Sequence, residues 1–109
     1  MIRQYKDYVE DIISSIEKIE NFVKGMAFEK FEKDDKTVFA VIRGLEIIGE
    51  AVKKIPSDIK SKHKSIPWKE MAGMRDKLIH EYFGIKPRVV WKTIKEDLPL
   101  LKIELINIR

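Results

Sequence analysis

The stretch DKTVFAVIRGLEIIGEAVKKIP, residues 35–56, does most to set the fold class of this chain. Its apolar side chains recur every three or four residues, which is the period of one buried face of an α-helix. The inward positions are Val38, Val41, Ile42, Leu45, Ile48, Val52 and Ile55. Asp34 or Asp35 is a suitable N-cap, and Pro56 stops a helix, so the pattern predicts a helix from about residue 36 to 55.

Small residues interrupt this otherwise strong helix at Gly44, Gly49 and Ala51. A glycine inside a helix costs up to about 1 kcal/mol relative to alanine. We therefore expect these positions to be where another helix approaches closely.

The same helical period recurs on both sides of this stretch. Residues 2–23 carry one continuous apolar seam, which predicts a long first helix that ends near Gly25. Residues 25–35 are expected to form a connection, and residues 57–65 a loop with one short turn at most.

Proline and glycine mark the remaining helices. The tripeptide Ser65-Ile-Pro predicts the start of a third helix, which Gly84 closes, and Pro87 begins a last one. Pro99 should kink or restart that last helix, because it lacks a backbone N–H. No segment alternates as a strand does, so the sequence predicts an all-α, up-and-down bundle of about four main helices.

Length and composition narrow the possible functions. The 109 residues fit one domain, and the absence of cysteine excludes disulfides, thiolate catalysis and cysteine-ligated zinc. With only two histidines we expect no metal and no cofactor. No stretch is apolar enough to span a membrane and no export signal is evident, so we expect a cytoplasmic protein without a membrane partner.

The net charge of +4 is unevenly distributed. Five lysines and a histidine gather where only Glu50 and Asp58 oppose them: Lys53, Lys54, Lys60, Lys62, His63 and Lys64. These lysines are candidates for RNA binding, because such a cluster attracts phosphates. A solvated, lysine-rich loop explains the same pattern equally well.

Arg75 departs from ordinary helical patterning. It falls on the apolar stripe of the third helix, which contains Trp68, Met71, Ala72, Leu78, Ile79 and Tyr82. A guanidinium does not lose its proton, so this position requires a carboxylate, an anionic ligand or a wet cleft. An ion pair with Glu46 or Glu50 is the structural alternative.

His80 and Asp76 complete a candidate catalytic group. Asp76 precedes His80 by four residues, so it can orient the imidazole and support its cation. Arg75 is five residues from His80, about 140° around the helix, so the two side chains do not point at one atom in a single helix. Convergence needs the reach of Arg75, a distorted helix end or a second subunit.

The segment Arg75-Asp-Lys-Leu-Ile-His80-Glu-Tyr82 resembles the R-x4-H-x-Y pattern of the HEPN superfamily, in particular its HepT-like toxin branch. The resemblance extends through 45–51, 66–68, 71–73, 90–91 and 97–99, in the family's order. It implies a small all-α protein that forms a homodimer or higher homo-oligomer, with two motifs lining one cleft. The implied activity is metal-independent cleavage of RNA by Arg75 and His80.

The resemblance also implies a partner. HepT-like proteins resemble toxins that a minimal nucleotidyltransferase antitoxin silences by adding AMP to the motif tyrosine, here Tyr82. The alternative is a non-catalytic helical module that engages a nucleotidyltransferase or binds nucleotide. Taken singly, His80 fits a surface histidine and Tyr82 a core-edge aromatic.

Apolar residues near the motif suggest how a dimer would form. We expect that a single small bundle does not bury all of Val89, Val90 and Trp91, and that a two-fold dimer would bury them. Trp68 and Trp91 are expected to be packing anchors, and Trp91 is a candidate for the dimer interface.

Overall fold

The structure, a computed structural model, describes residues 3–80 and 86–109, and the side chains of residues 3–74 and 86–109. Within these ranges all regular secondary structure is helical, which confirms the all-α prediction. The elements are α1 (Tyr5–Phe22), α2 (Phe28–Lys33), α3 (Asp35–Lys54), α4 (Ser57–Lys62), α5 (Trp68–His80), α6 (Pro87–Lys92), the π-helical segment η2 (Thr93–Asp97) and α7 (Leu98–Ile108).

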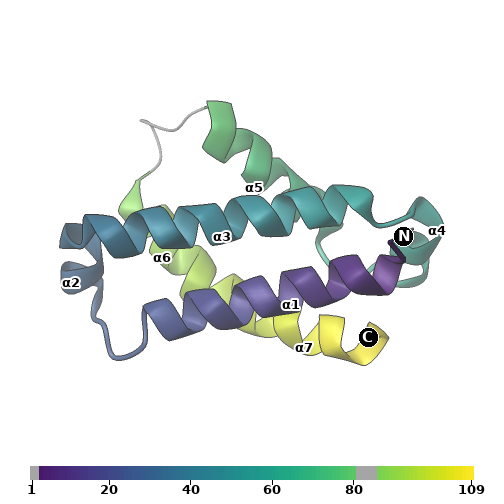
Figure 1. Cartoon of the computed structure of the whole chain (residues 1–109), viewed down its shortest axis with the longest axis horizontal. Helices are drawn as coiled ribbons and strands as arrows, with labels where there is room; N and C mark the ends of the chain where they lie inside the picture. The colour runs from purple at the N-terminus through teal and green to yellow at the C-terminus, as the bar shows by residue number, and fades with distance from the viewer. Residues whose placement is uncertain (1–2, 81–85) are drawn as a thin grey trace.

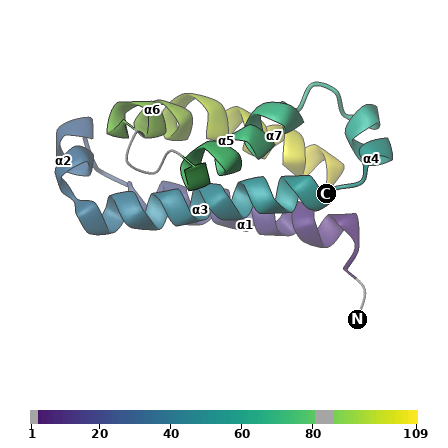
Figure 2. The ribbon, with the colours of Figure 1, turned by 90° about the horizontal axis from the view of Figure 1, so that it is seen from above.

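The long helices run up and down, as the sequence predicts. Figure 1 shows α1 and α3 side by side in opposite directions, with α2 at one end of the pair and α4 at the other. Viewed from above in Figure 2, α5 and the α6–η2–α7 run form a second layer over this pair. α3 packs most extensively against α1 and α5, so it is the central helix.

The core lies between these layers and uses the positions that the apolar period selects. The fully buried residues of α1 include Val9, Ile12, Ile16 and Ile19. On α3, the predicted inward residues Val41, Ile42, Leu45, Ile48 and Val52 are all buried. The period-based assignment of the core is therefore confirmed for both helices.

α1 and α3 come close together at Gly44. A Cβ atom added at Gly44 would lie 2.8 Å from both Cγ1 and Cδ1 of Ile19, which is itself fully buried. A larger residue at position 44 would therefore force the two helices apart or push Ile19 off its rotamer. The predicted close approach is confirmed at Gly44.

α1 ends near Gly25, as predicted, and α3 has its predicted N-cap at Asp34. Gly25 follows α1 with φ +78°, a conformation that favours glycine. At the start of α3 the Asp34 carboxylate accepts a hydrogen bond from the Thr37 backbone N–H at 3.1 Å. This hydrogen bond lowers the pKa of Asp34, because it stabilises the charged carboxylate.

Two predicted connections contain short helices. Residues 28–33 form α2 and residues 57–62 form α4, each of six residues. So short a helix shows too little periodicity to stand out in the sequence. α2 is held instead by Phe31, whose side chain is fully buried in the core.

Pro99 restarts the last helix, as predicted. It cannot donate an N–H to the preceding turn, so the helical hydrogen-bond ladder is interrupted there. The chain adopts a π-helical turn at Thr93–Asp97 immediately before Pro99, and α7 begins at Leu98. The result is one bent run, α6–η2–α7, instead of a single straight helix.

Gly44→Ala should destabilise the protein by about 1–3 kcal/mol, because the new methyl group meets the buried Ile19. Gly73→Ala is the matched control: nothing lies within 4 Å of a Cβ at this α5 position. It should be neutral or stabilising by up to about 1 kcal/mol. Urea denaturation measures both free energies of unfolding. Equal stabilisation of both variants would contradict the close approach of α1 and α3.

Candidate active site

The first half of α5, the helix that carries the Arg75 motif, is firmly anchored. Trp68 is buried, and its Nε1–H donates to the His63 backbone carbonyl at 3.0 Å. Just upstream, the Ser65 hydroxyl donates to Glu104 of α7 at 2.9 Å, and Ile66 is buried in the core. The expectation that Trp68 is a packing anchor is therefore confirmed, and the direction of α5 is fixed from its start.

Arg75, Asp76 and His80 all lie on this one helix, in its second half. The helical backbone confirms the register that the sequence predicts: Asp76 and His80 are one turn apart, whereas Arg75 and His80 are separated by about 140°. The side chains of these three residues lie outside the described set. Tyr82, the proposed modification site, and Gly84, the predicted helix end, lie outside the described residues altogether.

The two proposed carboxylate partners of Arg75 are both on α3, which packs against α5. Glu46 is half-buried, and its Oε2 lies 3.6 Å from Nη1 of Arg43 on the same helix. Glu50 is exposed in the next turn. An ion pair of either residue with Arg75 stays a prediction.

The lysine cluster lies at the end of the molecule where α5 begins. Lys53 and Lys54 are in the last turn of α3, Lys60 and Lys62 in that of α4, and Lys64 in the connection to α5. His80 is at the opposite end of α5, about 18 Å along the helix axis from Trp68. These lysines are thus grouped in space, but they surround the start of the motif helix and not its end (Figure 1).

An apolar groove of about 390 Å³ runs beside α5, between α3, α5 and the η2–α7 run. Met71 and Met74 of α5 form one wall, and Leu45 and Ile48 of α3 contribute to its floor. Met74 directly precedes Arg75, so the groove reaches the motif half of the helix. Three carboxylates, those of Glu70, Asp97 and Glu104, also line the groove. The apolar floor suits a protein surface, whereas the carboxylates would repel a phosphate backbone.

The largest exposed apolar side chains of α7 adjoin this groove. Leu100, which lines it, is 66% exposed, and Ile103, one turn further along α7, is 59% exposed. Neighbouring exposed apolar side chains at this spacing form a helix face that water solvates poorly. The sequence did not single out this groove or this face of α7.

Val89, Val90 and Trp91, which were expected to stay exposed in a single subunit, differ in their burial. Val90 is only 2% exposed, and Trp91 is half-buried against Phe31 with the ring centroids 5.0 Å apart, so the expectation that one subunit leaves these residues uncovered is wrong for Val90 but holds for Val89. Within that trio, Val89 is the most exposed, at 46%. The aromatic contacts on Trp91 come from Phe28 and Phe31 of α2, a helix that the sequence did not predict.

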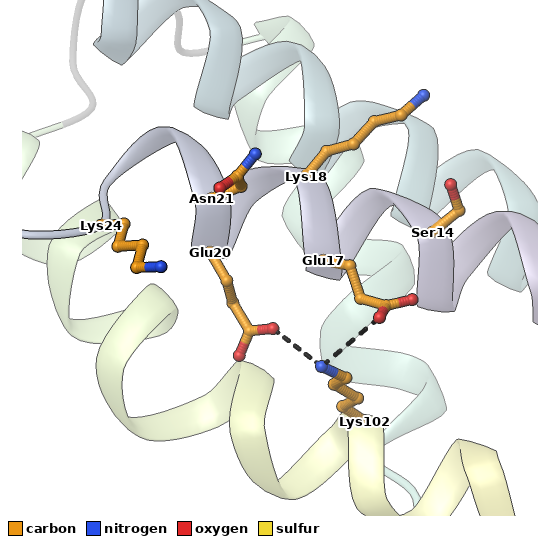
Figure 3. A pocket seen from close by; sticks show the side chains of 7 residues that line it. All are labelled: Ser14, Glu17, Lys18, Glu20, Asn21, Lys24 and Lys102. Carbon is orange, nitrogen blue, oxygen red and sulfur yellow. Dashed lines mark hydrogen bonds and ion pairs between the residues drawn. The ribbon is translucent and has the colours of Figure 1, made fainter.

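A second, open hollow lies between α1 and α7 and is structural in character. Figure 3 shows Lys102 of α7 reaching across it to two glutamates of α1. Its Nζ donates to Glu20 Oε1 at 3.0 Å and lies 3.8 Å from Glu17 Oε2. The hydrogen bond to Glu20 raises the pKa of Lys102. These contacts tie α7 to α1.

Two kinds of feature are missing from the part of the chain that the structure describes. Residues 3–74 and 86–109 contain no cluster of three or more histidine or acidic side chains able to hold a metal ion. Among the described helices, none is both long and apolar enough to cross a membrane.

Comparison with known proteins gives relatives over nearly the whole chain. A protein of Thermococcus cleftensis named "Probable ribonuclease HepT" is 63% identical over 102 residues, which cover 94% of this chain and 93% of that protein. Two further relatives have names that begin "Putative RNase". One, from Caldanaerobacter subterraneus, is 50% identical over 89% of this chain and 87% of its own length. The other, from Methanocaldococcus jannaschii, is 52% identical over 94% and 88%.

No solved structure matches this chain significantly. The family model described as "Ribonuclease HepT-like" matches residues 12–108, a span that contains α3, α5, α7, the Arg75 motif and most of α1. The resemblance drawn from the motif is thereby confirmed, and the chain belongs to the HepT-like ribonuclease family.

Proposed function

We propose that this protein is a metal-independent ribonuclease that cleaves RNA with Arg75 and His80 of α5. One observation carries the proposal: α5 is a continuous helix from Trp68 to His80, so it holds the whole R-x4-H motif in a fixed register. The names of its relatives as ribonucleases support the same activity. As a toxin acting on cellular RNA, the protein would work in the cytoplasm.

The residues supply what RNA cleavage needs. RNA carries its own nucleophile, so the protein has to move two protons and stabilise charge on the phosphate. One histidine takes the proton of the 2′-hydroxyl, whose oxygen attacks the adjacent phosphorus. A second histidine protonates the departing 5′-oxygen, and the products are a 2′,3′-cyclic phosphate and a 5′-hydroxyl. Arg75 holds two phosphate oxygens, and Asp76 orients the imidazole.

Two histidines per site require two subunits, since each chain contributes one His80. We place the dimer contact at the groove beside α5, with Leu100 and Ile103 of α7 at its edge. A second copy seated there would cover the exposed apolar face of α7. It would also approach α5 next to Arg75, because Met74 lines the groove. The Arg75–His80 mismatch of about 140° is then resolved between chains.

Regulation is proposed to act on Tyr82. A minimal nucleotidyltransferase would let the phenol oxygen attack the α-phosphorus of ATP, with pyrophosphate as the leaving group. The attached AMP adds a bulky anion two residues from His80, where Arg75 can bind its phosphate in place of RNA. The modified protein would therefore be silent as a nuclease.

The catalytic roles predict that purified protein cleaves RNA in EDTA, and that Arg75→Ala and His80→Ala are folded but lose at least about 100-fold in rate. Asp76→Asn should lose less, since it misorients the histidine without removing it. Gel analysis of a labelled RNA gives the rates, and circular dichroism checks the fold. Normal cleavage by either alanine variant would refute these roles. A protein that binds RNA without cutting it would be a non-catalytic module.

The dimer contact predicts a two-subunit species in sedimentation at micromolar concentration. Leu100→Glu with Ile103→Glu should give monomers, because charge on this face opposes its burial, and cleavage should fall with the dimer fraction. Phe22→Glu, at a 43% exposed site at the end of α1, is the matched control and should remain dimeric. A monomer with full nuclease activity would rule out the shared cleft.

The regulatory role predicts AMP on Tyr82 after co-expression with a cognate nucleotidyltransferase. Peptide mass spectrometry should locate the modification there, and Tyr82→Phe should escape silencing while it still cleaves RNA. Tyr8→Phe, a change of the same kind on α1, should be silenced like the unaltered protein. If the partner inhibits the nuclease while Tyr82 stays unmodified, inhibition occurs by binding alone.

A further inference from the structure

Three cations and a tryptophan share one face of the α6–η2 run. Arg88, Trp91, Lys92 and Lys95 follow the i, i+3, i+4, i+7 spacing of a helix face. Together with Phe28 of α2 they form the surface that we term the aromatic–basic stripe. Of the two acidic residues that follow, Glu96 is four residues after Lys92 and borders this face, whereas Asp97 is not three, four or seven residues from any member of the set.

The side chains of the stripe are stacked on one another. The Arg88 guanidinium carbon lies 4.2 Å from the centre of the Phe28 ring, and Lys95 Nζ lies 4.8 Å from the centre of the Trp91 ring. The two rings meet edge to face with centroids 6.2 Å apart. Both rings are only half-buried, whereas the three cations are exposed. The stripe therefore presents ring surface and positive charge to solvent side by side.

These cations also lack acidic partners in the described part of the chain. None of Arg88, Lys92 and Lys95 forms an ion pair with residues 3–74 or 86–109, whereas Arg3, Lys102 and Arg109 all do. A cation that rests on an aromatic ring keeps its N–H donors free for an anion. The stripe is thus better prepared to bind phosphate than an ordinary surface arginine or lysine.

The aromatic–basic stripe lies towards the end of α5 that carries His80. α5 runs from the α4 end of the molecule towards the half that contains α2 and α6, and both views show its last turn in that half (Figures 1 and 2). Only five residues separate His80 from Lys86, where the chain approaches α6. The aromatic–basic stripe therefore lies towards the His80 end of α5, and the lysine cluster around α4 lies towards the other.

We propose that the aromatic–basic stripe binds single-stranded RNA next to the cleaved bond. Arg88, Lys92 and Lys95 contact phosphates, while Trp91, Phe28 and the guanidinium plane of Arg88 offer surfaces on which unpaired bases stack. Duplex RNA keeps its bases stacked internally and gains only the phosphate contacts. The stripe thus favours unpaired RNA, and this inference rests on the proposed ribonuclease function.

Binding of a 2′-O-methyl RNA oligonucleotide, which cannot be cut, tests the stripe separately from catalysis. The variant Arg88→Gln, Lys92→Gln, Lys95→Gln should bind at least about 10-fold more weakly in fluorescence anisotropy, with a salt dependence shallower by about 2 in log–log slope. The matched control is Lys6→Gln, Lys18→Gln, Lys24→Gln, which removes three exposed lysines on and just after α1. It should bind within about 2-fold of the unaltered protein.

A second readout reports stacking at Trp91 itself. In Trp68→Phe the remaining indole is Trp91, whose fluorescence the single-stranded oligonucleotide should quench, with a duplex of the same length quenching it less. In Trp91→Phe the buried Trp68 should report no change. Equal weakening by both triple variants, full binding by the stripe variant or no RNA binding at all would each overturn the proposal. If the protein cleaves RNA normally in those cases, the ribonuclease function stands without the stripe.

Discussion

The close contact between Gly44 of α3 and Ile19 of α1 is the constraint on which the rest of the structure depends. Without a side chain at Gly44, the two longest helices pack backbone against side chain, and their apolar faces close into one core. α3 then has its other side free for α5, against which it also packs extensively. Helix–helix distances are set by the residues at the contact, so a larger residue at position 44 would displace both neighbours of α3.

The N-terminal end of α5, the helix that carries the motif, is anchored to the core and to α7. Trp68, Ile66 and the Ser65–Glu104 hydrogen bond hold the beginning of α5 against the core and α7. The second half of α5 carries Arg75 and His80, on opposite flanks of one helix. A fixed helix with diverging functional residues is consistent with the proposed site completed by a second subunit, whose contact we propose at the groove beside Met71 and Met74.

The sequence predicts most of this fold because long amphipathic helices repeat their signal over many turns. The core faces of α1 and α3, the Asp34 cap and the restart at Pro99 are all confirmed. α2 was missed, since six residues carry little periodicity and its place depends on Phe31 reaching Trp91 far along the chain. The same tertiary contact explains why Trp91 is partly covered within one subunit. The spacing of Arg88, Trp91 and Lys95 is visible in the sequence, but the contact of the Phe28 ring with Arg88 and Trp91 is not.

Positive charge gathers in two places, the lysine cluster around α4 and the aromatic–basic stripe on α6–η2. The motif helix α5 begins near the lysine cluster, and its His80 end lies towards the stripe (Figure 1). The proposed chemistry at the His80 end makes the 2′-hydroxyl of the substrate the nucleophile, so one substitution in the RNA tests it directly. An oligonucleotide with a single 2′-O-methyl group at the preferred cleavage position, incubated with the protein in EDTA, should remain intact at that bond. Cleavage at unmodified positions should continue and leave 2′,3′-cyclic phosphate ends. Cleavage at the blocked bond would show that water or a protein group attacks the phosphate, and would contradict the proposed roles of Arg75 and His80.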